Sequence, residues 1–207
     1  MVLDRPGNLR LDQIATPQEM LFREARTLFL MGLITSFPNR GDSAGPTWVA
    51  DAIMYLSSKS REPIKLVIES DGGSVDSGLM LYDVIKMSPA PVYTIARGDC
   101  CSMAAIILSA GARGHRMAYP HARMMLHLPL GQVMGDSKEV AIRSKELTKI
   151  KDLMVDLLME NGISKTRAQL LKDIDRECWL TTEEAISYGL IDQVMKHGDL
   201  FSTKKGD

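Results

Sequence analysis

Short apolar runs alternate with segments of helical periodicity along most of the chain, and this alternation constrains the fold more than any other sequence feature. Runs of this length predict buried strands, which we expect at residues 27–32, 64–68, 92–96, 115–119, 123–127 and 190–194. Helical spacing of apolar residues predicts helices at 47–58, 75–87, 102–112, 137–160, 164–172 and 181–188. Such alternation is typical of βαβ crossovers in an α/β protein, whose active groups collect where strands end and helices begin.

Length, charge and cysteine content exclude several classes of protein. The 207 residues are enough for one domain with its own core, and the net charge of −1 gives no sign of a nucleic-acid or membrane surface. The three cysteines, two of them adjacent, make a poor disulfide framework and no zinc-type spacing. The N-terminus lacks the apolar core of a signal peptide, and the longest apolar stretch, residues 100–112, is too short to span a membrane. We therefore expect a cytoplasmic protein.

Two strand ends carry residues that could form an active site. Gly72 and Gly73 follow one expected strand, where paired glycines allow a ligand to approach bare backbone N–H groups, although a plain turn uses the same residues. No Gly-Lys-Ser/Thr follows, which excludes a P-loop. Ser102 begins an expected helix, where its hydroxyl is a candidate nucleophile and the N–H of Met103 a candidate oxyanion donor. Ser102 could equally serve only as the helix N-cap.

A histidine and a group of acids complete the candidate set. His127 lies in an apolar strand, where a histidine can be a general base but is more often a satisfied core residue. Residues 173–179 place three acids and an arginine before a tryptophan, which on a surface is simply a solvated charge run. The other histidines have polar or turn neighbours and are expected at the surface. Each signal is weak alone, but together they supply the parts of a serine, histidine and acid triad.

Four stretches of the sequence carry a resemblance to a known family: LFLMG, IESDGGSVDSGLMLYDVI, GDCCSMAAIILSAGARGHRMAYPHARMMLHLPLG and DRECWLTTEEAISYGLIDQV. With them the chain resembles the proteolytic subunit of the caseinolytic (Clp) ATP-dependent protease over about residues 19–195. The resemblance implies a crotonase-like α/β fold of repeated ββα units with a protruding strand–helix handle. It divides the chain into an arm at 1–20, a protease-like domain at 21–195 with the handle at about 129–160, and a tail at 196–207.

The resemblance also implies roles for individual residues. Ser102 matches the nucleophile and His127 the general base, while Gly73 and Met103 match the donors of the two oxyanion N–H groups. The handle, which includes the glycine-bearing segment 129–135, would join one ring of subunits to another.

The acid of the triad is assigned by two neighbouring positions. When Arg176 and Trp179 are aligned with the family pattern, the usual aspartate falls on Glu177, which is one methylene longer but can still accept from an imidazole N–H. Asp173 and Asp175 remain candidates if the loop slips. Asp175 and Arg176 also match an acid–arginine pair that the family uses at the contact between rings.

Several positions depart from the family pattern and mark a divergent member. Asp71 replaces a proline before the two glycines, two cysteines stand before the serine, and Leu128 replaces a glutamine. The aromatic positions that the family offers to its ATPase loops fall on Lys65 and Val67, which argues against docking of a standard unfoldase. The N-terminal arm and the loop at 37–47 also match poorly.

These observations predict a serine endopeptidase subunit of a compartmentalised ring protease that hydrolyses peptides and unfolded proteins. It would self-associate into two stacked heptameric rings, a tetradecamer, and rely on an AAA+ unfoldase for folded substrates. No metal or cofactor is expected, since the partner would bind the ATP. One alternative is a catalytically weak or inactive ring subunit that assembles with an active paralogue. Another is an acyl-CoA hydratase or isomerase of the same superfold, which uses the oxyanion donors without this serine and histidine.

Overall fold

A largely parallel sheet organises the molecule. The computed structural model describes residues 16–35, 45–129, 134–196 and 199. Five strands run parallel in the order β1 (Thr27–Ile34), β2 (Ile64–Gly73), β3 (Val92–Cys101), β4 (Arg116–Ala118) and β7 (Gln193–Val194). Two more strands, β5 (Arg123–Leu126) and β6 (Cys178–Leu180), extend from β3, and β6 runs antiparallel to β5. The parallel pairing confirms the predicted α/β class.

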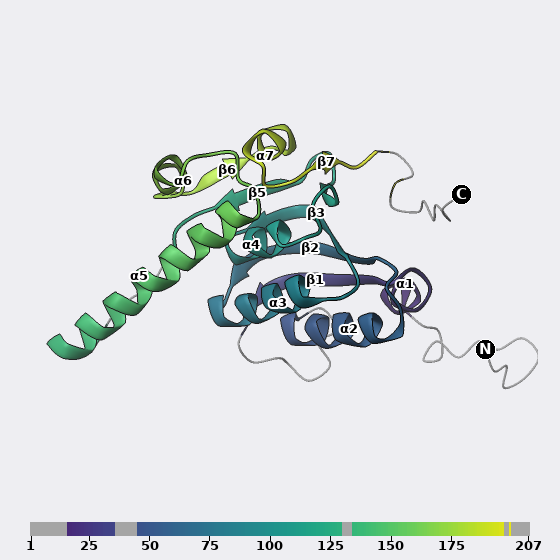
Figure 1. The fold of residues 1–207 in the computed structure, drawn as a ribbon, viewed down its shortest axis with the longest axis horizontal. Helices are drawn as coiled ribbons and strands as arrows, with labels where there is room; N and C mark the ends of the chain where they lie inside the picture. Colours follow the sequence, from purple (N-terminus) through teal and green to yellow (C-terminus); the bar gives the residue numbers. More distant parts are fainter. Residues whose placement is uncertain (1–15, 36–44, 130–133, 197–198, 200–207) are drawn as a thin grey trace, which may run out of the picture.

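Seven helices surround the sheet in the described part of the chain (Figure 1). They are α1 (Pro17–Ala25), α2 (Pro46–Lys59), α3 (Val75–Met87), α4 (Met103–Ser109), α5 (Ser137–Glu160), α6 (Arg167–Asp173) and α7 (Thr182–Tyr188). Helices α2, α3 and α4 pack side by side on one face, and every residue of α4 is buried. Helix α5 is anchored at its C-terminal end and projects from the body (Figure 1). None of the helices in the described segments has both the length and the apolar character needed to cross a bilayer.

Strand β3 forks, and the fork builds the edge where the site lies. Residues 94–96 pair with β4, whereas residues 99–101 pair with β5 in the same parallel sense. Gly98, with a φ of 80°, lies between the two pairings, where a left-handed backbone favours glycine. The residue after β3 is therefore held beside the residue that follows β5.

The structure corrects some of the predicted elements. The bounds expected for 75–87 and 137–160 agree with α3 and α5. Residues 17–20, the described part of the expected arm beyond Thr16, are helical and begin α1, whose capping box joins Thr16 and Glu19. The turn expected after residue 68 is a continuation of β2, because Leu33 and Ile34 of β1 pair with the two glycines. Strand β6 was not predicted. Most of the 37–47 loop, residues 1–15 of the arm, residues 130–133 of the handle and most of the tail lie outside the described residues.

A second, smaller apolar cluster covers the other face of the sheet. Val67, Ile95 and Met195 are buried there, with Phe29, Met117 and Tyr119 packed against them. Val67 is only 2% exposed. Val67, one of the two positions that the resemblance aligns with aromatic docking residues, therefore contributes to a small core.

The C-terminal end of α5 is fixed by a buried asparagine. Asn161, which caps the helix, is 3% exposed, and its amide nitrogen donates to the hydroxyls of Tyr82 and Ser109 at 3.0 and 2.9 Å. Its amide oxygen accepts from Lys86 at 3.1 Å, and its backbone carbonyl accepts from Arg116 at 2.8 Å. Burial raises the pKa of Tyr82, so that hydroxyl stays protonated. One side chain therefore joins α3, α4 and the base of α5.

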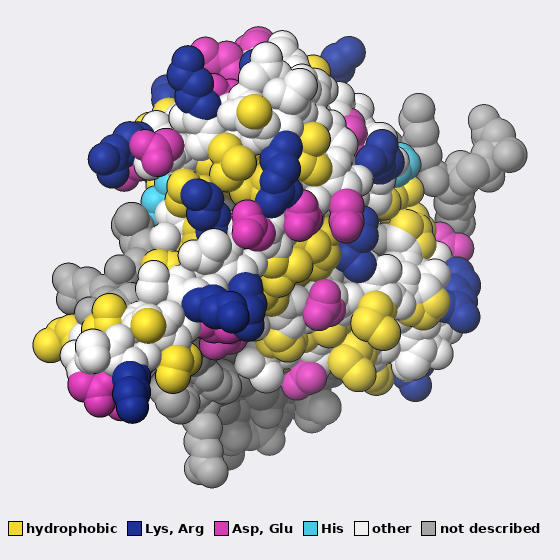
Figure 2. Space-filling model, turned by 60° about the vertical axis from the view of Figure 1, so that its left-hand side comes forward, with side chains coloured by type: hydrophobic (Ala, Val, Ile, Leu, Met, Phe, Trp, Pro, Cys, Tyr) yellow, Lys and Arg dark blue, Asp and Glu magenta, His cyan; other side chains and the backbone are white. Residues whose placement is uncertain are grey.

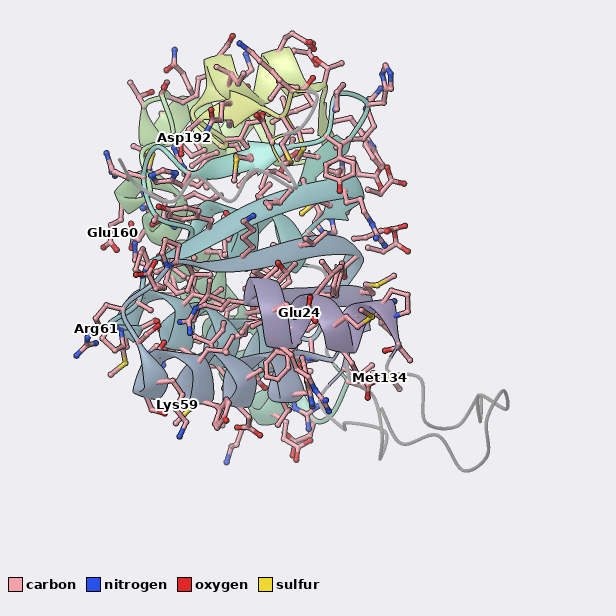
Figure 3. The ribbon with its side chains drawn as sticks, turned by 90° about the vertical axis from the view of Figure 1, so that its right-hand side faces the viewer. Glu24, Lys59, Arg61, Met134, Glu160 and Asp192 are labelled. Carbon is pink, nitrogen blue, oxygen red and sulfur yellow. The ribbon has the colours of Figure 1, made fainter. Side chains whose placement is uncertain are left out.

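The same cluster reaches the last strand through an ion pair. Arg116, which is 5% exposed, donates to both carboxylate oxygens of Asp192 at 3.0 and 2.6 Å. Partial burial raises the pKa of Asp192, but the hydrogen bonds and charge of Arg116 outweigh it and leave that pKa below its usual value. Glu160, whose carbonyl accepts from Arg113 at 2.8 Å, lies on the same side of the molecule (Figure 3). Cations at the last carbonyls of α5 also offset the negative end of its dipole.

Replacing the asparagine should destabilise the whole domain. In Asn161→Leu, the Tyr82 hydroxyl and the Lys86 ammonium lose their hydrogen-bond partner and the Ser109 hydroxyl keeps only its bond to Ile106, which should cost about 3 kcal/mol. We expect the midpoint of thermal unfolding, at fixed protein concentration, to fall by about 6–12 °C. Gln193→Ala is the matched control, because the Gln193 amide makes one exposed hydrogen bond to Gly114 at 3.2 Å. Equal, small shifts for the two variants would contradict the anchoring role.

Candidate active site

The backbone of Ser102 is held in an unusual conformation. Its φ is 54° and its ψ is −124°, and only one other described non-glycine residue, Arg26, has a positive φ. The hydrogen bond from its N–H to the carbonyl of Met125 at 2.8 Å fixes this turn against β5. Strained backbone of this kind persists only where the surrounding structure enforces it, and such residues cluster at active sites.

The side chain of Ser102 meets His127. Their Oγ and Nε2 atoms are 2.7 Å apart, and Ser102 makes no side-chain capping bond to α4 although it occupies the N-cap position. His127 directly follows β5 and is half-buried. The fork of β3 therefore brings together two residues that are 25 positions apart in the sequence. A hydroxyl that bonds to an imidazole at a helix N-terminus can lose its proton to that imidazole and act as a nucleophile.

The two glycines allow close backbone packing, Gly72 against Ser102 and Gly73 against β1. A Cβ placed on Gly72 would lie 2.8 Å from Cβ of Ser102 and 3.0 Å from the backbone nitrogen of Met103, so no side chain fits there. Gly73, with a φ of 140°, packs against Ile34 of β1 instead. The N–H of Met103 is the first of a helix, and such groups have no intrahelical acceptor. Because of this close approach, backbone rather than a side chain packs against Ser102 and the first residue of α4.

The pairing of β5 with β6 brings Glu177 next to the histidine. Leu126 and Cys178 are the last directly opposed pair of this antiparallel ladder, and His127 follows β5 just as Glu177 precedes β6, so both residues lie at the same end of the ladder. The carboxylate nevertheless accepts a hydrogen bond from Nε1 of Trp179 at 2.9 Å. Within the described residues, the His127 side chain makes one hydrogen bond, which is the one to Ser102.

The other acids of the loop are placed differently. Asp173 accepts a hydrogen bond from the hydroxyl of Tyr188 at 3.0 Å, and burial, followed by that bond, raises the pKa of Tyr188. Asp175 and Arg176 are exposed and make no hydrogen bond or ion pair with the described part of the chain. Of the two alternative acids, Asp173 therefore already accepts a hydrogen bond, whereas the exposed Asp175 side chain makes none with the described residues.

The thiols beside the serine are poor nucleophiles. Cys100 is fully buried, and burial raises its pKa well above the usual range. Burial, followed by the charges of Asp99, Asp71 and Glu177, raises the pKa of Cys101 to about 11. Because the thiolate is the reactive form, these environments favour Ser102 over its neighbours.

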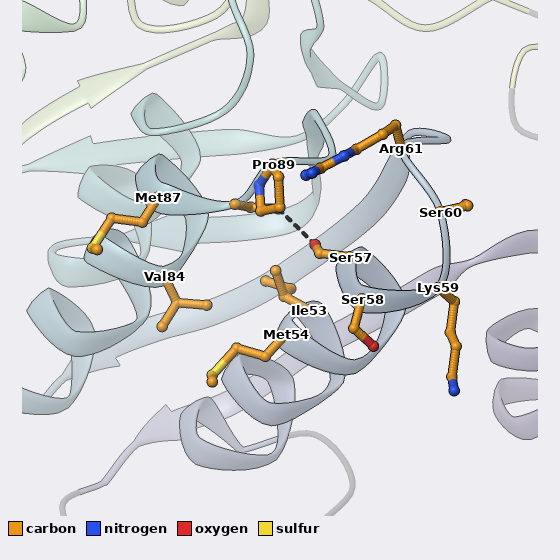
Figure 4. A pocket seen from close by; sticks show the side chains of 11 residues that line it. Ile53, Met54, Ser57, Ser58, Lys59, Ser60, Arg61, Val84, Met87 and Pro89 are labelled. Carbon is orange, nitrogen blue, oxygen red and sulfur yellow. Dashed lines mark hydrogen bonds between the residues drawn. The ribbon is translucent and has the colours of Figure 1, made fainter.

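A groove lies away from this site, between the C-terminal ends of α2 and α3 (Figure 4). Its volume is about 650 Å³, and its lining includes Met54 and Met87, which are 61% and 81% exposed. Two of its lining residues, Ser57 and Ser88, are hydrogen-bonded to each other at 2.8 Å. Exposed apolar side chains around a concavity are typical of a surface that contacts another molecule.

The forked parallel sheet and the serine–histidine pair together define a hydrolase-like site on a crotonase-like α/β fold. A family model described as Clp protease matches residues 16–198. The chain belongs to the Clp protease family, a family of peptidases, which confirms the resemblance seen in the sequence.

Three relatives are similar over most of their length. The ATP-dependent Clp protease proteolytic subunit of Carsonella ruddii (strain PV) is 32% identical over 194 residues, which cover 94% of both chains. That of Borreliella afzelii (strain PKo) is 32% identical over 194 residues, 94% of this chain and 93% of the relative. The ATP-dependent Clp protease proteolytic subunit 2 of Prochlorococcus marinus (strain MIT 9312) is 40% identical over 157 residues, 75% of this chain and 77% of the relative. These matches do not favour the hydratase alternative or an inactive subunit.

Sequence reasoning missed the part played by Trp179. Residues i and i+2 of a strand point to the same face, so the two-residue spacing from Glu177 could have suggested the contact. The signal was lost because the strand that carries Trp179 was not expected. Arg123 also stacks on the Trp179 ring, with its guanidinium carbon 5.8 Å from the ring centroid.

Proposed function

We propose that the chain is a serine endopeptidase subunit in which Ser102 is the nucleophile and His127 the general base. The observation that carries the proposal is the 2.7 Å separation of Oγ and Nε2 at the start of α4. Oγ attacks the carbonyl carbon of the scissile peptide bond while its proton passes to Nε2. His127 then gives that proton to the leaving amine. A water molecule repeats the sequence on the acyl ester and regenerates the serine.

The oxyanion of each tetrahedral intermediate would be bound by the N–H groups of Gly73 and Met103. The close approach of Gly72 to Met103 supports this assignment, because it brings the glycine backbone to the first turn of α4. Removing one such donor typically costs about 3 kcal/mol of transition-state stabilisation. Glu177 is the proposed acid, which would accept from Nδ1 of His127 and hold the imidazole in the reactive tautomer.

The proposed substrates are peptides and unfolded proteins, and the proposed assembly is a pair of stacked heptameric rings. Folded substrates would need an ATP-dependent unfoldase as partner, so this chain itself would need no cofactor. The groove with Met54 and Met87 supports contact with another protein chain. We place Asp175 and Arg176 at the contact between rings, where their exposed side chains could meet a second copy. A cytoplasmic location is consistent with the free cysteines of the described residues.

Helix α5 should take part in assembly. Its projecting part exposes Ile142 at 70% and Val140 at 37%, and apolar side chains are visible on it at the lower left of Figure 2. We expect light scattering to give a mass many times that of the 22.9 kDa chain at micromolar concentration. Ile142→Glu should lower that mass, whereas Lys145→Glu, an exposed change on the same helix, should leave it unchanged. A stable wild-type monomer would contradict the proposal.

Covalent labelling tests the nucleophile directly. A fluorophosphonate should form a stable ester with Oγ of Ser102, and mass spectrometry of the digested protein should locate it. An adduct on Cys100 or Cys101, or no adduct, would show that the proposed chemistry is wrong.

A further inference from the structure

The carboxylate of Glu177 has two possible hydrogen-bond partners, and it bonds to the one that does not serve catalysis. Its Oε2 atom accepts from Nε1 of Trp179 at 2.9 Å. The indole nitrogen is only a donor and has one proton, so this bond occupies the only polar group of the tryptophan. The bond is exposed to solvent, and bonds of this kind exchange readily.

The second partner is within reach. Leu126 and Cys178 are the last directly opposed pair of the β5–β6 ladder, and His127 and Glu177 are the next residues at that same end. The hydrogen bond from N–H of Leu128 to the carbonyl of Ile174 at 2.9 Å holds the two segments of the chain together on the far side of His127. With the backbone fixed on both sides of the histidine, the choice of partner depends on rotation of the Glu177 side chain.

Trp179 is held in place independently of the glutamate. The Arg123 guanidinium lies 5.8 Å from the centroid of its ring, and Arg123 and Trp179 lie on the paired strands β5 and β6. The ring is 42% exposed, so a smaller aromatic residue can replace it without leaving a hole in the core. The indole N–H is therefore a fixed donor, and the mobile member of the pair is the carboxylate.

We propose that the indole N–H of Trp179 is a latch that competes with His127 for the carboxylate of Glu177 and keeps the resting subunit weakly active. This inference rests on the proposed function of Ser102 and His127. Trp179 is a positioning residue, since it acts through Glu177 and not on the substrate. Release of the latch lets Glu177 turn to Nδ1 of His127 and complete the triad.

Trp179→Phe is the variant that tests the latch, because it removes the N–H and keeps a ring for Arg123 to stack on. We expect the rate constant for fluorophosphonate labelling of Ser102, measured at its alkaline plateau, to rise about fivefold. That factor corresponds to the net free energy of one hydrogen bond. The acid limb of the pH profile should move to higher pH. The physical reason is that a carboxylate next to an imidazole favours the charged form of the ring.

Two further variants give the test its controls. In the Glu177→Gln background, Trp179→Phe should produce neither the rise nor the pH shift. Trp48→Phe changes the chain's other tryptophan, which packs on Phe22 with ring centroids 5.6 Å apart, and should leave labelling unchanged. In the Trp48→Phe protein, Trp179 is the single tryptophan. Its fluorescence emission should change when a peptide substrate is added and the Glu177 carboxylate leaves the indole N–H.

The outcomes separate the latch from the proposed function. Labelling of Ser102 at an unchanged or lower rate in an assembled Trp179→Phe protein would overturn the latch and leave the proposed function standing. A rise that persists in the Glu177→Gln background would also overturn it, because the effect would not pass through Glu177. Wild-type protein that is never labelled at Ser102 would instead overturn the proposed function.

Discussion

Replacing Ser102 with alanine should remove peptidase activity while leaving the fold and the assembly intact. Loss of a catalytic serine lowers kcat by about 10⁴-fold or more, because the remaining groups act as a unit with it. The backbone at position 102 should keep most of its positive φ in the alanine variant, because its N–H can still donate to the carbonyl of Met125, as Ser102 does at 2.8 Å. The measurement is hydrolysis of a fluorogenic peptide at saturating substrate, with the mass of the assembly checked by light scattering.

Cys101→Ala is the matched control for this variant. It changes the adjacent side chain by one atom, as Ser102→Ala does, and it removes a thiol whose pKa is raised to about 11 by burial and by neighbouring carboxylates. Its activity should stay within about threefold of the wild type, since an unionised thiol is a poor nucleophile. Activity retained in Ser102→Ala but lost in Cys101→Ala would reverse the assignment of the nucleophile.

The sequence could suggest Ser102 as a nucleophile but could not exclude its role as an N-cap. Both roles need a short hydroxyl side chain at the start of a helix. What distinguishes them is where the side chain points, and that depends on a backbone turn with a φ of 54° and on the position of His127. Neither can be read from local sequence, because β5 reaches the site only through the fork in β3. The long helices α3 and α5 were predicted with their bounds, since their periodicity is local.

Short strands, unlike the long helices, could not be predicted from local periodicity. Strand β6 has only three residues, Cys178–Leu180, and an alternation of that length cannot be told from a loop. Its existence depends on the partner strand β5, which makes it a tertiary feature. Missing this strand also hid the relation between Glu177 and Trp179. The family pattern could align Glu177 with the triad acid, but only the structure shows which donor its carboxylate meets.

Removing the charge of Glu177 should lower kcat strongly without disturbing the fold. In Glu177→Gln the amide can still accept from Trp179, so local packing is kept, but His127 loses the carboxylate that would fix its tautomer and stabilise its cation. Loss of that carboxylate in a serine triad costs about 10⁴-fold in kcat. The measurement is peptidase kinetics on the assembled protein, with KM expected to change little.

Two neighbouring acids provide the comparison for Glu177→Gln. Asp175→Asn should leave the chemical step intact, because its exposed side chain makes no contact with the described part of the site. Asp173→Asn should act mainly on stability, because its carboxylate accepts from Tyr188 at 3.0 Å. If Glu177→Gln keeps full activity while one of the other two loses it in an intact assembly, the acid is wrongly assigned. If all three keep activity, the serine and histidine work as a dyad, and the latch at Trp179 has no catalytic carboxylate to hold back.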